Sequence, residues 1–178
     1  LAATLARVGV NRASLGVQDL NPHVQKAIGR IQPYAVVTAA VEALRRAGID
    51  ALSFDLMYGL PHQSLPDLLR RIDLAVALQP GRISLFGYAH VPWFKTHQRL
   101  IDEAALPDTA KRFRQANAAR DALIAHGYEA IGLDHFALPT DSMALMARDQ
   151  TLKRNFQGYT TDEADALLGL GRLCKAGN

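Results

Sequence analysis

Apolar positions recur at helical spacing in three long stretches of the chain, and each stretch ends at a turn signal. The stretches are 33–48, 66–81 and 108–127. Proline or aspartate opens each one and glycine closes it, as is common at helix boundaries. Shorter helices are expected at 23–28 and 142–149, with a further helical turn at 164–168.

Four apolar runs of strand length are interleaved with these helices, and one face of the strands is small and polar. The runs are 8–17, 51–57, 83–88 and 128–133, whereas 155–161 is expected to be a loop. Alternating strands and helices predict a parallel sheet with right-handed crossovers. In the second run a period of two separates Ser53 and Asp55 from an apolar face.

The polar strand face favours a barrel over an open sheet. A barrel interior holds ligands at the carboxyl ends of its strands, whereas a sheet covered on both faces is more uniformly apolar. Ser14 and Gln18 lie on the corresponding face of the first run. Because three or four strands do not close a barrel, we predict an α/β fold that is part of a β/α (TIM-like) barrel. The missing strands are expected upstream of Leu1.

Composition and charge limit the function classes. The 178 residues are 49% hydrophobic and 21% charged, and the net charge is +3. No apolar run of about 18 residues predicts a membrane helix, and no basic run suggests nucleic acid. Residues 1–7 resemble an interrupted amphipathic helix and not a signal peptide. The single cysteine, Cys174, excludes an internal disulfide, so we expect a cytoplasmic protein without a membrane partner.

Individual residues are ambiguous without further context. Asp55, at a strand end, suits a ligand contact or a helix cap equally, and Arg30 resembles a surface arginine. The histidines at 62, 90 and 135 lie in separate segments without metal-type spacing, so we expect no metal site. Trp93 and Phe94 are expected to pack within a loop.

Five segments form a more specific pattern. They are 9–19 (GVNRASLGVQD), 55–63 (DLMYGLPHQ), 86–92 (FGYAHVP), 127–137 (GYEAIGLDHFA) and 155–161 (NFQGYTT). Over about residues 1–171 the chain resembles the oxygen-independent coproporphyrinogen III oxidases, which are radical S-adenosylmethionine (SAM) enzymes. The first two segments are shared with haem-chaperone-like paralogues. The last two are specific, because the paralogues typically carry Ser-Asn in place of Asp134–His135 and lack the 155–161 run.

The resemblance implies a fold, a reaction and partners. Residues 1–105 would be the downstream half of a radical SAM barrel, and 106–178 a small mixed α/β C-terminal segment with a substrate-side loop. The implied reaction is the oxidative decarboxylation of coproporphyrinogen III to protoporphyrinogen IX in haem biosynthesis. It uses a 5′-deoxyadenosyl radical made from SAM at a [4Fe–4S] cluster, with an electron donor such as a flavodoxin or ferredoxin.

The resemblance also implies roles for particular residues. Gln18, Arg30, Asp55 and Ala89 match SAM-binding positions, and Gln157 matches a glutamine for substrate handling or catalysis. In the family, the cysteines of a Cys-x-x-x-Cys-x-x-Cys motif ligate the cluster, and this sequence does not contain that motif. One thiolate cannot replace the three or four that such a cluster needs. The ligands are therefore expected upstream, and this fragment is expected to be inactive alone. The tail 172–178 departs from the family, so no SAM contact is carried over near Lys175.

Two rivals stay open at this point. The first is a haem-binding or haem-transfer paralogue of the same superfamily that lacks oxidase activity. The second is an unrelated barrel enzyme, such as an aldolase-like lyase without a cluster. Oligomeric state, the physiological electron donor and acceptor, and the origin of the truncation are not determined by the sequence.

Overall fold

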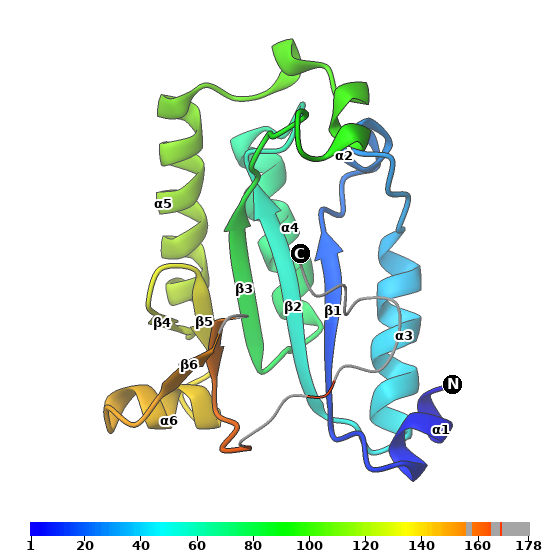
Figure 1. Cartoon of the computed structure of the whole chain (residues 1–178), viewed down its shortest axis with the longest axis vertical. Helices are drawn as coiled ribbons and strands as arrows, with labels where there is room; N and C mark the ends of the chain where they lie inside the picture. The colour runs from blue at the N-terminus through cyan, green and yellow to red at the C-terminus, as the bar shows by residue number, and fades with distance from the viewer. Residues whose placement is uncertain (156–157, 165–167, 169–178) are drawn as a thin grey trace.

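The protein is organised around a five-stranded mixed sheet with helices on one face (Figure 1). We describe the computed structural model over residues 1–155, 158–164 and 168. The strand order is β1-β2-β3-β5-β4, and β1–β3 are parallel. The strands are β1 (Arg12–Gln18), β2 (Ala51–Tyr58), β3 (Arg82–Gly87), β4 (Glu129–Ile131) and β5 (His135–Ala137).

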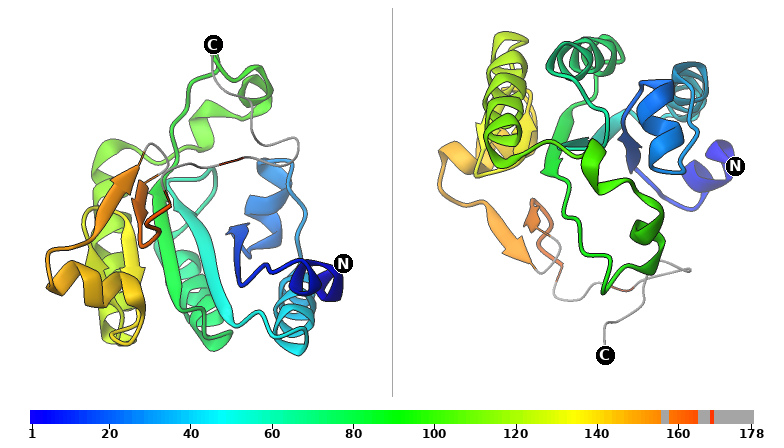
Figure 2. Two further views of the ribbon diagram at one scale, coloured as in Figure 1. Left: turned by 60° about the horizontal axis from the view of Figure 1, so that its bottom comes forward. Right: turned by 90° about the horizontal axis from the view of Figure 1, so that it is seen from above.

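Three long helices cover one face of this sheet, as the view from above in Figure 2 shows. They are α3 (Tyr34–Arg46), α4 (Leu65–Ala77) and α5 (Thr109–Ala125). On the opposite face lie a two-stranded hairpin and the segment 88–106. The remaining elements are α1 (Ala2–Arg7), α2 (Pro22–Ala27), the 3-10 turns η1 (Thr96–Leu100) and η2 (Glu103–Ala105), α6 (Ser142–Arg148), β6 (Lys153–Asn155) and β7 (Gly158–Thr160).

Local sequence explains where the helices begin. The Ser64 hydroxyl accepts a hydrogen bond from the Asp67 backbone N–H at 3.2 Å, ahead of α4. The Asp108 carboxylate accepts from the Lys111 backbone N–H at 2.7 Å, ahead of α5. Each cap satisfies a backbone donor that has no partner inside the helix. The described part of the chain contains no helix long and apolar enough to span a membrane.

The hydrophobic core lies between the sheet and the three helices. On β2, Leu52, Phe54 and Leu56 are at most 1% exposed, whereas Ser53 and Asp55 on the other face are half-buried. The period-two prediction for this strand is therefore confirmed. The core is completed by residues of the neighbouring strand and helices, among them Val41, Leu68, Ile72, Ile83, Leu85 and Leu123.

The sheet differs from the sequence prediction at its far edge and at its start. The predicted strand 128–133 is present only as the short strand β4; the chain then turns at Gly132, with φ +65°, into β5, which was not predicted. β5 pairs antiparallel with β3, so the sheet is mixed and not wholly parallel. The predicted strand 8–17 begins only at Arg12, because Gly9 turns the chain after α1 with φ +89°.

The C-terminal part holds one further difference. The expected loop 155–161 contributes to the hairpin β6–β7, whose strands of three residues are too short for periodicity to reveal. The helix expected at 142–149 is confirmed as α6. Gln157, most of the helical turn expected at 164–168 and the tail 172–178 lie outside the described residues.

Candidate functional site

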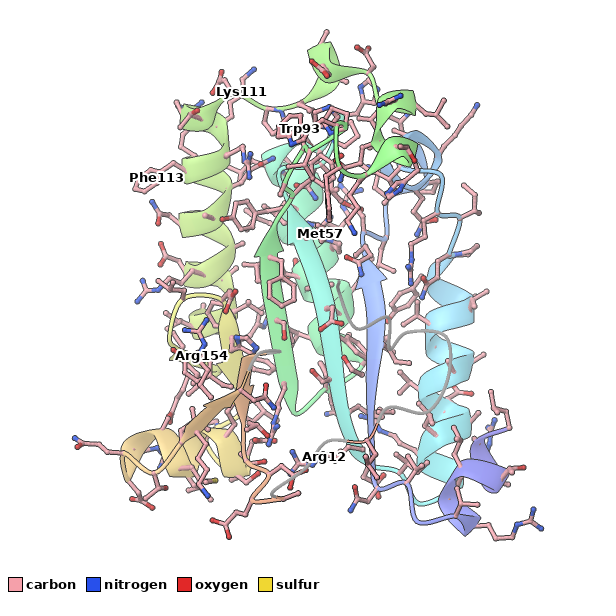
Figure 3. The ribbon with its side chains drawn as sticks, viewed as in Figure 1. Arg12, Met57, Trp93, Lys111, Phe113 and Arg154 are labelled. Carbon is pink, nitrogen blue, oxygen red and sulfur yellow. The ribbon has the colours of Figure 1, made fainter. Side chains whose placement is uncertain are left out.

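The carboxyl ends of β1 and β2 bring two predicted site residues to neighbouring positions. Gly16 of β1 lies opposite Asp55 of β2, and after an irregularity Gln18 lies opposite Leu56. Gln18 has φ +59°, an uncommon value for a residue with a side chain. This turn ends β1 next to the polar face that carries Asp55. Figure 3 labels Met57, which follows Asp55 further along β2, and Arg12 at the start of β1.

Arg30 reaches the same place from the loop after α2. Its Nη2 donates to the Gly16 carbonyl at 2.6 Å, and its Nε donates to Gln32 Oε1 at 3.1 Å. A Cβ atom on Gly16 would lie 3.0 Å from Gln18 Nε2 and 3.2 Å from Arg30 Nη2. Glycine is therefore needed here to let both side chains approach the backbone. Gln18, Arg30 and Asp55 thus form one cluster at the ends of β1 and β2.

Ala89, the fourth predicted SAM contact, lies on the loop that follows β3. Its carbonyl accepts a hydrogen bond from Gln98 Nε2 at 3.0 Å, and the Val91 N–H donates to Gln98 Oε1 at 2.6 Å. Gln98 is only 8% exposed. This buried amide holds the loop in one conformation at the edge of the sheet that also carries Gln18.

The loops after β1 and β2 are held in the same way. After β1, Gln25 Nε2 donates to the carbonyls of Asp19 (2.8 Å) and Gln32 (2.6 Å), and its Oε1 accepts from the Gln32 N–H (3.0 Å). After β2, Gln63 Oε1 accepts from the Gly59 N–H at 2.8 Å. We call Gln25, Gln63 and Gln98 the loop-bridging glutamines. Gln25 also fixes the backbone of Gln32, whose side chain accepts from Arg30.

A buried ion pair lies beneath the site. Asp19 and Arg71 are each at most 2% exposed, and Arg71 Nη1 pairs with Asp19 Oδ2. The carboxylate also accepts from the Asn21 N–H (2.7 Å) and from Gln63 Nε2 (2.8 Å). Arg71 Nη2 donates to the Met57 carbonyl at 3.1 Å. Burial lowers the pKa of Arg71 to about 9, which leaves it cationic at neutral pH.

A cavity of about 250 Å³ opens on the polar face of the sheet. Asp55 and Ser14 line it, and the Ser14 hydroxyl donates to Asp55 Oδ2 at 3.3 Å. Burial raises the pKa of Asp55, and hydrogen bonds from Ser14 and Ser84 and the charge of His135 offset part of that rise. The structure therefore holds a carboxylate where ionisation is disfavoured, as is frequent at functional sites.

The raised pKa of Asp55 predicts that Asp55→Asn stabilises the protein at neutral pH. The folded-state pKa exceeds the ordinary value of 3.8, so the folded state resists ionisation more than the unfolded state does. The disadvantage of wild type should be largest at neutral pH, shrink as the pH falls through the raised pKa and vanish below 3.8. Urea unfolding at several pH values measures it. Asp50→Asn, at an exposed position, is the control, and a variant less stable than wild type at neutral pH would contradict the prediction.

His135 lines this cavity together with Tyr159 of β7, and Asp134 lies next to it. His135 Nδ1 lies 2.7 Å from Asp134 Oδ1. The His135 ring packs edge-on against the rings of Tyr159 (5.5 Å between centroids) and Phe86 (6.0 Å). A Cβ atom on Gly132 would fall on the Tyr159 ring. The two sequence segments that separate the resembled family from its paralogues, 127–137 and 155–161, therefore meet in space.

Arginines line the other end of the cavity. Arg82 Nε donates to Asp141 Oδ1 at 2.8 Å and its Nη2 donates to the Ser142 hydroxyl at 2.9 Å. Arg12 donates to two hydroxyls, those of Thr161 (3.0 Å) and Ser142 (3.3 Å). Burial lowers the pKa of Arg82, and Asp141 opposes that shift. Neither arginine was predicted from the sequence to belong to the site. Each stands at the start of a strand, on the polar face, and that position is the signal that could have indicated it.

The structure corrects the expectation for Trp93 and Phe94 and shows the surroundings of the histidines. Trp93 and Phe94 do not pack within their loop, because they are 76% and 74% exposed. The three histidines considered as metal ligands do not converge. His90 contacts Tyr88 and Glu103 instead. Among the described residues, no three histidine, cysteine, aspartate or glutamate side chains form a metal-binding group.

Comparison with known proteins finds a radical SAM family model and relatives named as coproporphyrinogen III oxidases. Residues 1–75 match the model of the radical SAM superfamily. The chain is 56% identical over 163 residues to the oxygen-independent coproporphyrinogen III oxidase of Bradyrhizobium diazoefficiens, covering 92% of this chain and 36% of that protein. It is 52% identical over 167 residues to the anaerobic coproporphyrinogen III oxidase 1 of Cereibacter sphaeroides, covering 94% of this chain and 37% of the relative.

Solved structures agree. The Escherichia coli coproporphyrinogen III oxidase HemN, described as a radical SAM enzyme, superposes with a TM-score of 0.90 at 38% identity, covering 96% of this chain and 39% of HemN. An archaeal Elp3 from Methanocaldococcus infernus shares the fold alone, with a TM-score of 0.52 at 16% identity over 66% of this chain and 28% of Elp3. The chain thus spans a little over a third of the curated relatives it matches.

Proposed function

Because the chain belongs to the family of the oxygen-independent coproporphyrinogen III oxidases, we propose that the protein converts coproporphyrinogen III to protoporphyrinogen IX in haem biosynthesis. In this reaction a propionate side chain loses a hydrogen atom, carbon dioxide and one electron, and a vinyl group remains. SAM and a [4Fe–4S] cluster supply the radical chemistry when bound, while the protein binds and orients the reactants.

We propose that Gln18, Arg30 and Asp55 hold SAM. The donor set fits its amino-acid end, because a guanidinium pairs well with a carboxylate and a carboxylate with an ammonium group. Hydrogen bonds to the Gly16 carbonyl and to Gln32 Oε1 orient the Arg30 side chain toward the end of β1. Ala89, on the neighbouring loop fixed by Gln98, is proposed to form part of the same cofactor site.

The residues in hand do not fit the cluster. The sequence has one cysteine, and the described residues contain no metal-binding group. We propose that the cluster ligands belong to a part of the protein outside these 178 residues. Residues 1–105 would then form the downstream half of the barrel, and 106–178 the C-terminal segment.

One observation carries the choice of substrate: Asp134–His135 lies against the strand β7, which carries Tyr159. These two segments distinguish the oxidases from the haem-chaperone-like paralogues, and here they line one wall of the cavity that contains Asp55. Gln157, which precedes β7 and lies outside the described residues, is proposed to handle substrate at this wall. The proposed setting is cytoplasmic, with a flavodoxin or ferredoxin as electron donor and with no nucleic-acid or membrane partner.

An anaerobic turnover assay tests the function. Full-length protein with SAM, a reduced flavodoxin or ferredoxin and coproporphyrinogen III should form protoporphyrinogen IX, measured as the porphyrin after oxidation. A preparation limited to these 178 residues is the negative control. Cys174 cannot hold a four-iron cluster alone, so no product is expected even after reconstitution with iron and sulfide. Lack of turnover by cluster-loaded full-length protein would contradict the proposal.

A haem titration separates the remaining rival. A haem-transfer paralogue would bind haem tightly and form no protoporphyrinogen IX. The contact between His135 and Tyr159 disfavours that alternative, because it joins two segments in which the paralogues differ: they typically carry Ser-Asn in place of Asp134–His135 and lack the 155–161 run.

A further inference from the structure

We propose that Asp134 and His135 form a recognition pair for a carboxylate group of the substrate, with His135 Nε2 as the donor. The inference rests on the proposed function, because that function supplies a tetrapyrrole with several propionate carboxylates. It adds a substrate-binding role for two residues that are not members of the proposed SAM cluster of Gln18, Arg30 and Asp55, although His135 lines the same cavity as Asp55.

The geometry leaves a single nitrogen of His135 for a ligand. Asp134 Oδ1 occupies Nδ1 at 2.7 Å, and Nε2 has no hydrogen-bond partner within the described part of the chain. The His135 side chain is 15% exposed and lines the cavity. A carboxylate on Nδ1 fixes the orientation of an imidazole, so that its other nitrogen points in one direction.

The hairpin β6–β7 restricts the His135 ring further. A Cβ atom on Gly158, whose φ is +136°, would lie 3.5 Å from His135 Nε2. Tyr159 and Phe86 present ring edges and faces at about 90° to the imidazole plane. These rings provide an apolar wall beside the free nitrogen, which suits a carboxylate attached to a pyrrole ring.

The charges around the cavity favour an anionic ligand. Arg82 is matched by Asp141 at 2.8 Å, whereas the acceptors of Arg12 among the described residues are hydroxyl groups. The other carboxylate that lines the cavity is Asp55, and burial disfavours its charge. A ligand carboxylate would accept a hydrogen bond from the Nε2–H of His135.

The test is a fluorescence titration with coproporphyrin III, the stable oxidised tetracarboxylate, and with its tetra-amide, in which every carboxylate is an uncharged amide. His135→Gln and Asp134→Asn should each weaken coproporphyrin III binding roughly three- to tenfold, the loss expected for one hydrogen bond. Neither should change tetra-amide binding.

The chain offers a matched control in His126, whose Nε2 lies 2.8 Å from Asp73 Oδ1 outside this cavity. His126→Gln should leave both titrations unchanged. If His135→Gln melts at a lower temperature than wild type, its weaker binding could come from lost structure. Asp134→Asn keeps the size and shape of the side chain, so its affinity then decides whether the pair recognises a carboxylate.

The outcomes separate the inference from the proposed function. Wild-type preference for coproporphyrin III that survives both variants would overturn the inference alone. Equal losses with the tetra-amide would also overturn it, since they would indicate packing and not carboxylate recognition. Wild-type protein that binds neither compound would overturn the proposed substrate as well.

Discussion

Replacing Asp19 by alanine is expected to lower the free energy of unfolding by about 3–5 kcal/mol, the range for removing one partner of a buried ion pair. Arg71 would keep its charge at 2% exposure without a carboxylate partner. The Asn21 N–H and Gln63 Nε2 would lose their acceptor as well. Urea unfolding followed by circular dichroism measures the loss.

Two further variants test the cause. Asp19→Ala combined with Arg71→Met should recover part of the loss, because the second change removes the unpaired buried charge. Glu42→Ala breaks an exposed pair with Arg46 (3.6 Å) and should change stability by less than about 1 kcal/mol. An Asp19→Ala variant as stable as Glu42→Ala would show that the buried pair contributes little.

Replacing Arg30 by alanine is expected to weaken SAM binding about ten- to a hundredfold. A charge-assisted hydrogen bond contributes roughly 1.5–3 kcal/mol, which corresponds to that range. Arg30→Lys should restore only part of the affinity, because an ammonium group lacks the planar two-pronged donor of a guanidinium. Isothermal calorimetry on full-length protein gives both values.

The control for this prediction is Arg46→Ala, which removes an exposed arginine of α3 and should leave SAM affinity unchanged. If Arg30→Ala binds SAM as wild type does, Arg30 serves only to hold Gly16 and Gln32. The assignment of Arg30 to the cofactor site would then be wrong.

Much of the sheet and part of the site were predictable because they depend on local periodicity. The alternation along 51–58 predicted which side of β2 is buried, and the same pattern placed Asp55 on the polar face. Pro33, Pro66 and Asp108 predicted, to within one residue, where the three long helices begin. That the carboxyl ends of parallel strands share one edge then predicted that Gln18 and Asp55 would lie near one another.

Features that depend on contacts between distant segments were not predictable in this way. Arg71 lies next to Ile72 among the buried residues of α4. The sequence around Arg71 does not indicate which carboxylate pairs with it, because Asp19 lies on a distant segment of the chain. The short strands β4 and β5 offer three residues each, too few for a period. The approach of Tyr159 to His135 depends on how the hairpin folds back over the sheet.

The loop-bridging glutamines have a consequence for how pH experiments on this protein should be interpreted. A side-chain amide donates and accepts as a peptide group does, and it neither titrates nor responds to ionic screening as an ion pair does. Gln25, Gln63 and Gln98 should therefore keep the rim of the site in shape over the range in which Asp55 changes protonation. A pH-dependent affinity would then report the ionisation of a side chain in the site and not a rearranged backbone.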